Sequence, residues 1–210
     1  MLEPVEMRWA FIRKVYSIVA IQLLATIAVA ATVVTVRPVA YFFVSSWAAL
    51  CSLACYHRKH PVNYLLLGVY TVSLAFSVGL TCAFSFTSGK VILESVILTA
   101  VVVVALTLYT FWAASRGHSF NFLGAFLLGV ILVLLVFSLI QIFFPLGRIS
   151  VMIYGCLASI IFCGYIIYDT DDLIKRYSYD EYILAAISLY LDIINLFLRL
   201  LTVLRAANRN

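Results

Sequence analysis

The most informative shortage in this sequence is charge. Only 11% of the 210 residues are charged, whereas 65% are hydrophobic and 15% are aromatic. Soluble chains are typically about a quarter charged, and a soluble domain could not hide this much apolar surface. The mean hydropathy of +1.12 therefore indicates a protein whose main solvent is lipid.

Several chemical motifs are missing as well. The five cysteines form no CxxC pair and the three histidines lack HExxH spacing, so we expect no zinc site, disulfide framework or other cofactor. The net charge of +5 comes from short basic clusters between apolar runs, which is typical of topology signals and not of nucleic-acid binding. The cysteines are interpreted as packed or lipid-facing small hydrophobes: Cys51, Cys55, Cys82, Cys156 and Cys163.

Seven apolar runs are long enough to cross a bilayer. Backbone polar groups must be paired in hydrocarbon, so each run is predicted to be a helix. The second run is the weakest, because it is barely long enough to cross. The fold class is an all-α membrane protein, a seven-transmembrane-helix bundle in one domain over residues 1–210. The expected spans are residues 15–36, 38–56, 63–85, 91–114, 120–144, 149–174 and 179–204.

The basic residues gather in alternate connections, which predicts a cytoplasmic amino terminus. An odd number of spans then places the carboxyl terminus on the opposite side, whereas a last segment that does not cross fully would leave it in the cytoplasm. Lys175 and Arg176 are interpreted as ordinary charges at the cytoplasmic edge of the membrane. The basic residues on the predicted cytoplasmic side are Arg8, Arg13, Lys14, Arg58, Lys59, Arg116, Lys175 and Arg176.

Charged residues inside the spans are the candidates for function, because a charge near the bilayer centre costs about 3 kcal/mol even on a lenient scale. Glu94 and Arg199 lie close enough to span ends for their side chains to reach an interface. Asp169 and Asp192 do not. These two aspartates therefore require a partner, a proton or a water-filled path.

The two aspartates are expected to face one another. Asp169 lies seven residues before Arg176, about 10 Å inside the sixth span, and Asp192 lies thirteen residues after Tyr179, about 20 Å along the seventh. A short connection makes these spans antiparallel neighbours. The seventh span also carries one polar stripe at helical spacing, which belongs inside the bundle: Ser188, Asp192, Asn195 and Arg199.

Two carboxyl groups in a medium of low dielectric constant cannot both ionise cheaply, so the pair should hold a shared proton. When the proton leaves, repulsion favours separation of the helices or entry of a cation, and carboxylate oxygens suit calcium. The pattern indicates a proton-sensitive gate in which Asp169 and Asp192 contact calcium. A purely structural role, in which each aspartate bonds a neighbouring helix, stays open.

Two other classes of protein are alternatives to a proton-sensitive gate. An intramembrane aspartyl protease also needs two aspartates on its sixth and seventh helices, and Tyr168 with Asp169 fits its first motif. Its second motif, GxGD, is replaced here by LYLD, in which Tyr190 and Leu191 are bulky. We therefore expect no enzyme. The third class is a non-conducting membrane regulator that acts on protein partners through its short loops.

The chain from RWAFIRKVY to LFLRLL resembles the transmembrane Bax inhibitor motif family, and most closely its lifeguard branch. The resemblance rests on GYIIYDT, YDEYILAA and LYLDIINLF in this order, with KHPVNY, LESVILTAVVV, FNFLGAFL and FPLG elsewhere. It implies seven helices with the last one central, and a pH-sensitive calcium leak with a paired-aspartate sensor at Asp169 and Asp192. It also implies an endoplasmic reticulum or Golgi membrane and suppression of cell death.

The resemblance also implies a basic latch for the first aspartate at the end of the second helix. The corresponding stretch here is YHRKHP, where the latch position falls on His57 with Arg58 next to it. The region before this stretch is shorter than in most lifeguard proteins.

Overall fold

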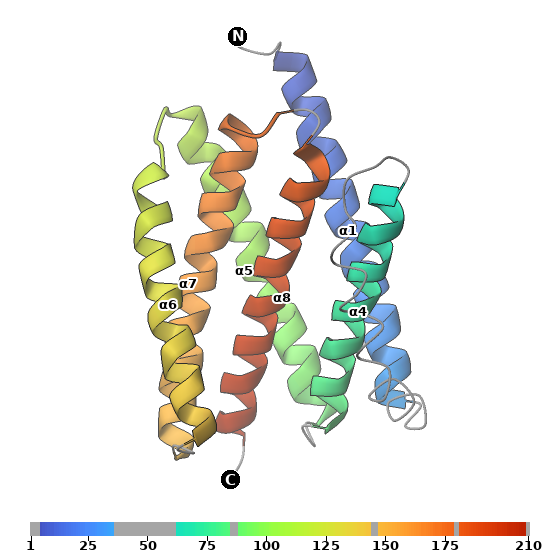
Figure 1. Cartoon of the computed structure of the whole chain (residues 1–210), viewed down its shortest axis with the longest axis vertical. Helices are drawn as coiled ribbons and strands as arrows, with labels where there is room; N and C mark the ends of the chain where they lie inside the picture. Colours follow the sequence, from blue (N-terminus) through green and yellow to red (C-terminus); the bar gives the residue numbers. More distant parts are fainter. Residues whose placement is uncertain (1–4, 36–61, 85–87, 144–146, 179–180, 209–210) are drawn as a thin grey trace. The chain divides into compact units, whose positions relative to one another are not determined.

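A computed structural model of the chain describes residues 5–35, 62–84, 88–143, 147–178 and 181–208. These residues form six α-helices and no strand (Figure 1). The helices are α1 (Val5–Thr35), α4 (Val62–Phe84), α5 (Gly89–Ser115), α6 (Asn121–Phe143), α7 (Arg148–Lys175) and α8 (Tyr182–Ala207).

Six of the seven expected spans coincide with these helices. Their ends agree within three residues, except that α1 begins at Val5, ten residues before the predicted start at residue 15. The early start is explained by the charged residues of the first turns, which continue the helix beyond its apolar part. The expected span over residues 38–56 lies outside the described residues. The prediction of seven helices is therefore not supported by the part of the chain that the structure describes.

Five of the six helices are long and apolar enough to cross a membrane, namely α1, α5, α6, α7 and α8. The remaining helix, α4, contains a shorter apolar stretch over Leu67–Ala83. Large apolar side chains are exposed along most of these helices, as expected for surfaces that face lipid. The chain is therefore a multi-pass membrane protein.

The described helices divide into two compact units. One unit contains α5 to α8 together with the first turns of α1, up to Ile12, and the other contains α4 with the remainder of α1, from Arg13. In the larger unit α7 contacts α5, α6 and α8, and α5 also contacts α8. Figure 1 shows α6 and α8 on opposite sides of α7. A greater share of α8 is buried than of any other described span.

Small residues let α7 approach its neighbours closely. A Cβ atom at Gly155 would lie 2.6 Å from a methyl carbon of Val203 on α8, and one at Gly164 would lie 2.9 Å from a methyl carbon of Leu127 on α6. Such contacts are the usual basis of helix association in membranes, where apolar side chains gain little from leaving lipid. They hold α8 against one side of α7 and α6 against another.

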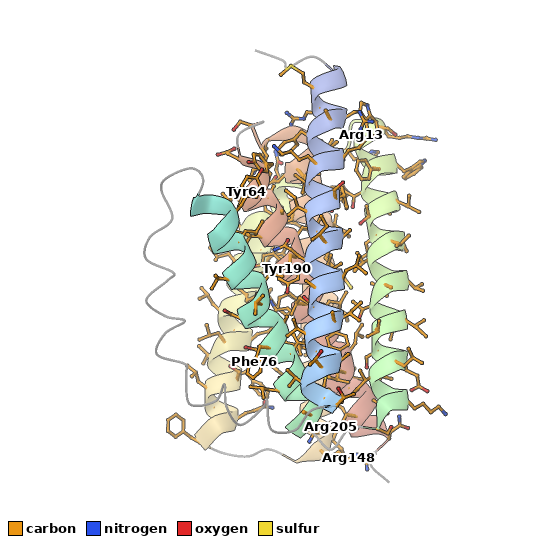
Figure 2. All side chains as sticks on the ribbon, turned by 90° about the vertical axis from the view of Figure 1, so that its right-hand side faces the viewer. Arg13, Tyr64, Phe76, Arg148, Tyr190 and Arg205 are labelled. Carbon is orange, nitrogen blue, oxygen red and sulfur yellow. The ribbon has the colours of Figure 1, made fainter. Side chains whose placement is uncertain are left out.

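In the smaller unit α4 packs against α1 by the same means. A Cβ atom at Gly79 would lie 2.9 Å from the Cβ of Val33. Phe76, which is labelled in Figure 2, forms a buried cluster with Val33. The Gln22 amide donates a hydrogen bond of 3.0 Å to the Thr71 hydroxyl across the same interface. This buried bond pairs the Gln22 amide nitrogen across the interface, while the Thr71 hydroxyl donates to the Leu67 carbonyl of its own helix at 2.7 Å.

The end of α5 sets the course of the loop that reaches α7. Gly117 has a φ of +80°, which only glycine adopts without strain. Its N–H donates to the Ala114 carbonyl at 3.0 Å, and the His118 N–H donates to the Ala113 carbonyl at 3.1 Å, the two bonds of a Schellman motif. The motif turns residues 118–120 toward the last turns of α7.

Candidate functional site

The aspartate pair lies between α7 and α8. Asp192 is buried, with 7% of its surface exposed, and Asp169 is half-buried. Their carboxyl groups are within hydrogen-bonding reach of one another. Because ionised carboxylates have no donor, a hydrogen bond between them requires one shared proton. The structure therefore brings together the two residues that the sequence singled out.

The depth of the pair differs from the prediction. α8 begins at Tyr182, three residues later than expected, so Asp192 lies ten residues into its helix, or about 15 Å along it. Asp169 lies six residues from the end of α7 at Lys175, about 9 Å along that helix. Asp192 remains the deeper of the two, but by less than the sequence suggested.

The groups around the pair are hydroxyls. The Ser188 hydroxyl donates to the Ala185 carbonyl at 3.1 Å and is also within hydrogen-bonding reach of Asp169 and of the Tyr177 hydroxyl. Burial raises the pKa of Tyr177, which lies beyond the end of α7. Tyr165, one turn before Asp169, is close enough to interact electrostatically with both carboxyl groups. These hydroxyls can solvate a carboxylate without neutralising it.

No cation neutralises the pair within the described ranges. The salt bridges found there join Lys90 to Glu94, Lys175 to Asp171 and Arg176 to Asp172. One carboxylate oxygen of Asp192, Oδ2, is buried without a hydrogen-bond partner among the described groups. The predicted latch residues His57 and Arg58 lie outside the described residues, so their position relative to Asp169 stays a prediction.

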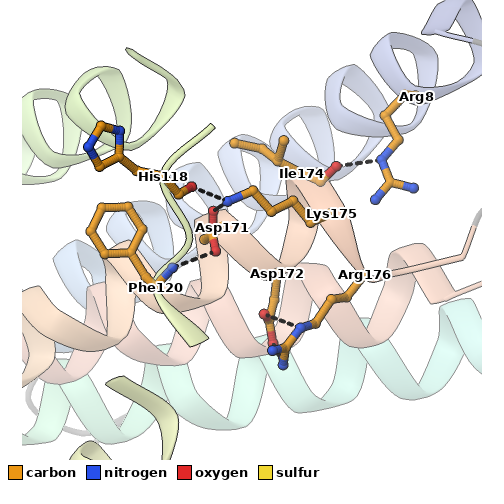
Figure 3. A network of polar contacts seen from close by, with 8 residues as sticks. All are labelled: Arg8, His118, Phe120, Asp171, Asp172, Ile174, Lys175 and Arg176. Atoms are coloured by element: carbon orange, nitrogen blue, oxygen red, sulfur yellow. Dashed lines mark hydrogen bonds and ion pairs between the residues drawn. The ribbon is translucent and has the colours of Figure 1, made fainter. Parts of the chain in front are cut away.

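A second acidic group, which the sequence analysis passed over, lies two residues beyond Asp169. Asp171 is 1% exposed, accepts a hydrogen bond of 3.1 Å from the Phe120 N–H and forms a salt bridge with Lys175. Lys175 also donates to the His118 carbonyl (Figure 3). The interpretation of Lys175 as an ordinary edge charge was wrong, because its ammonium group neutralises a buried carboxylate.

Arg176 and Arg8 complete this region, again as Figure 3 shows. Arg176 lies 3.3 Å from Asp172 and donates to the Tyr168 hydroxyl at 3.2 Å. The Arg8 Nε donates to the Ile174 carbonyl at 2.5 Å, one of the carbonyls that a helix end leaves unpaired. The spacing of four residues between each aspartate and its basic partner was a signal that could have revealed both salt bridges.

The other candidate residues lie apart from the pair. Glu94 is half-buried and lies 3.9 Å from Lys90. Asn195 donates to the Leu191 carbonyl of its own helix at 2.9 Å. Arg199 lies over the ring of Tyr154 at 5.2 Å, and its Nε is buried without a hydrogen-bond partner in the described part of the chain. The predicted stripe on α8 thus combines one buried residue, Asp192, with half-buried neighbours.

Calcium prefers six to eight oxygen ligands, and the described residues do not supply such a set. No group of three or more His, Cys, Asp or Glu side chains converges among them. Asp169 and Asp192 alone would leave most of the hydration shell of an ion in place. This donor set suits brief contact with a passing cation better than tight binding.

The chain matches a family model described as inhibitor of apoptosis-promoting Bax1 over residues 8–210. It is 71% identical to Protein LIFEGUARD 4 of Arabidopsis thaliana, covering 99% of this chain and 89% of the relative. It is 35% identical to Protein lifeguard 4 of Mus musculus, covering 98% and 88%. It is 36% identical to the Golgi anti-apoptotic protein of Vaccinia virus (strain Lister), covering 98% and 89%.

The match to the Arabidopsis protein extends over 221 positions, 11 more than the 210 residues of this chain. That relative therefore carries residues inside the matched region that have no counterpart here. The family model nevertheless covers the chain from residue 8 to its end, including both aspartates. The chain belongs to the family of inhibitors of apoptosis-promoting Bax1 and, within it, to the lifeguard proteins.

Proposed function

We propose that this protein is a pH-sensitive calcium leak channel of an intracellular membrane, that Asp169 and Asp192 form its proton sensor, and that it suppresses cell death. The observation that carries the proposal is the buried meeting of these two carboxyl groups. No salt bridge of the described residues includes either of them. A pair arranged in this way is stable with a shared proton and unstable without it.

The proton controls the contact between α7 and α8. With the proton in place, one carboxyl group donates to the other and the two helices are held together. Without it, two negative charges face each other in a medium of low dielectric constant, where their repulsion is much stronger than in water. Separation of the helices or entry of a cation relieves this repulsion. The Ser188 hydroxyl is placed to solvate Asp169 in either state, and the Tyr177 hydroxyl lies within hydrogen-bonding reach of Ser188.

The cellular part of the proposal rests on the relatives. Their names describe lifeguard proteins and a Golgi anti-apoptotic protein, which supports an endomembrane location and a role in limiting cell death. Calcium leak from an internal store is a direct route to such a role. Fractionation of cells that express the tagged chain tests the location, and recovery in the plasma membrane alone would contradict it.

A non-conducting regulator is the second candidate, and the anti-apoptotic names of the relatives favour it equally. Such a protein would act through membrane partners of the cell-death machinery and would pass no ions. An aspartyl protease has no comparable support. Leu189, buried three residues before Asp192, occupies a position where the protease motif requires glycine, and so does Leu191.

Reconstitution separates a channel from a regulator. Purified protein is placed in calcium-free liposomes that contain a calcium-sensitive dye, calcium is added outside, and the initial rate of uptake is recorded from about pH 5 to about pH 9, the range in which buried carboxyl groups titrate. The proposal predicts uptake above that of protein-free liposomes and a rate that changes with pH. Uptake equal to protein-free liposomes at every pH would favour the regulator.

A further inference from the structure

Asp171 is the most buried charged residue of α7, and it takes no part in the aspartate pair. Its carboxylate accepts the Phe120 N–H at 3.1 Å and forms a salt bridge with Lys175. Lys175 in turn donates to the His118 carbonyl. The buried carboxylate thus ties α7 to the loop between α5 and α6 by one direct bond and one bond through a lysine.

A second attachment holds the same end of α7. The Arg8 guanidinium donates to the Ile174 carbonyl at 2.5 Å and to the Tyr177 carbonyl at 3.4 Å. Next to it, Trp9 stacks on Phe111 of α5 with ring centroids 6.3 Å apart. The last turn of α7 is therefore bound by the first turns of α1 as well as by the α5–α6 loop.

The helical position of Asp171 links this attachment to the pair. Successive residues of an α-helix are about 100° apart, so side chains two positions apart point in nearly opposite directions. Asp171 accordingly faces the α5–α6 loop while Asp169 faces α8. A carboxyl group about 6 Å from the helix axis moves by about 2 Å when the helix rotates by 20°. Such a shift would break the 3.1 Å bond to Phe120.

We propose that Asp171 is a positioning residue that fixes the rotation of the last turns of α7 and so holds Asp169 opposite Asp192. The role of the pair as a gate rests on the proposed function, but the positioning of its side chains does not. Asp172 provides a matched comparison, since it is the next residue and also has a basic partner four residues later. Its contacts with Tyr168 and Arg176 stay within α7.

Cross-linking measures the positioning without any reference to ion flux. Asp169→Cys and Asp192→Cys are introduced together into a chain whose five native cysteines are replaced by alanine. The initial rate of cross-linking by a short bifunctional methanethiosulfonate reagent is then measured in liposomes. Asp171→Leu should lower this rate about fivefold, the effect of about 1 kcal/mol, whereas Asp172→Asn should leave it unchanged. Asp171→Asn, which still offers an oxygen to Phe120, should fall between them.

A reference cross-link separates a rotation of the last turns of α7 from loss of the fold. Tyr154→Cys and Arg199→Cys join the same two helices near their other ends, where Arg199 now lies over Tyr154. In a folded Asp171→Leu variant this reference rate stays normal while the 169–192 rate falls. Lys175→Met, which leaves Asp171 in place, gives a second variant with the same expected direction. Equal 169–192 rates in all variants would overturn the proposal, whatever the calcium measurements show.

Discussion

Two acidic regions lie close together on α7 and α8, and they are built in opposite ways. In the first, which we call the anchor, Asp171 is surrounded by a backbone N–H and the Lys175 ammonium group. In the second, the pair, Asp192 meets another carboxyl group, and its Oδ2 has neither a hydrogen-bond partner nor a cation among the described residues. Asp171 Oδ1 also lacks a hydrogen bond there, but it faces the Lys175 ammonium group. Both aspartates are buried, at 1% and 7% exposure.

This difference shows that burial alone does not identify a functional carboxylate. A buried charge with a cation and a hydrogen-bond donor contributes to structure, because removing it leaves its partners unsatisfied. A buried carboxyl group that faces a like group contributes little to structure and responds to protons. The surroundings of each aspartate therefore predict opposite consequences of substitution.

The largest effect on stability is expected for Asp171→Leu, and Asp192→Leu is the comparison. Asp171→Leu should lower the free energy of unfolding by about 2 kcal/mol, somewhat less than for a fully buried pair because the Lys175 side chain is 30% exposed. Asp192→Leu should leave it unchanged or raise it, since it removes an unsatisfied polar atom. Unfolding in detergent micelles at neutral pH measures both. A similar loss in both variants would erase the distinction between anchor and pair.

Arg199 extends the comparison to a charged residue held by an aromatic ring. Tyr154, which lies under its guanidinium, also stacks on Phe137 with centroids 5.4 Å apart and donates to the Leu134 carbonyl at 3.4 Å. Tyr154→Leu should cost about 1 kcal/mol of stability, and Tyr154→Phe, which keeps the ring, should cost less. The same micelle assay applies. If Tyr154→Phe cost as much stability as Tyr154→Leu, the stabilisation would come from the hydroxyl and not from the ring.

Asp172→Asn tests whether the anchor depends on its contacts beyond α7. Asp172 and Arg176 are more exposed than Asp171 and Lys175, and their salt bridge stays within one helix. We expect a loss of about 0.5 kcal/mol, typical of exposed ion pairs at this spacing. If Asp172→Asn proved as damaging as Asp171→Asn, the loop contacts of Asp171 would not be what sets it apart.

The smallest effect is expected at the connection between α7 and α8. The Ser178 N–H donates to the Glu181 carboxylate at 3.0 Å, and this bond lowers the pKa of Glu181. Because the pKa of Glu181 is lower in the folded state, the bond stabilises the fold at pH values above the pKa of an unfolded glutamate, about 4.3. This contribution is lost as the pH falls through the pKa of Glu181 in the folded protein. Glu181→Gln should slightly lower the melting temperature at pH 7, and this difference should shrink as the pH falls below the unfolded value of about 4.3. A difference that does not shrink as the pH falls would contradict this origin.

The sequence predicted most of the helices because hydrophobic length is a strong signal in a membrane protein. Apolar runs located α4 to α8 within three residues, and the need for a partner directed attention to Asp169 and Asp192. The start of α1 was missed because its first turns are charged, and hydropathy does not follow a helix beyond its apolar part. The expected span over residues 38–56 and the latch at His57 and Arg58 lie outside the described residues and stay predictions.

The anchor was missed for a different reason. Asp171 and Lys175 lie at the edge of a span, where charges are common, and their spacing alone does not show that one of them is buried. The contact of Asp171 with Phe120 joins residues 51 positions apart, and it depends on the turn at Gly117. Arg8 reaches α7 across 166 positions. No local sequence pattern predicts these contacts, because they form only when α1, the α5–α6 loop and α7 pack together.

The pH profile of calcium uptake by liposomes tests the central claim most directly, with wild type beside Asp169→Asn, Asp192→Asn and the control Asp172→Asn. The account predicts that wild type is pH-dependent and that Asp172→Asn, which removes a charge that acts on Asp169, keeps this dependence with at most a shifted midpoint. Both pair variants flatten it, and Asp192→Asn, the deeper of the two, changes uptake more. Identical profiles in all four proteins would contradict the claim that the buried pair senses protons.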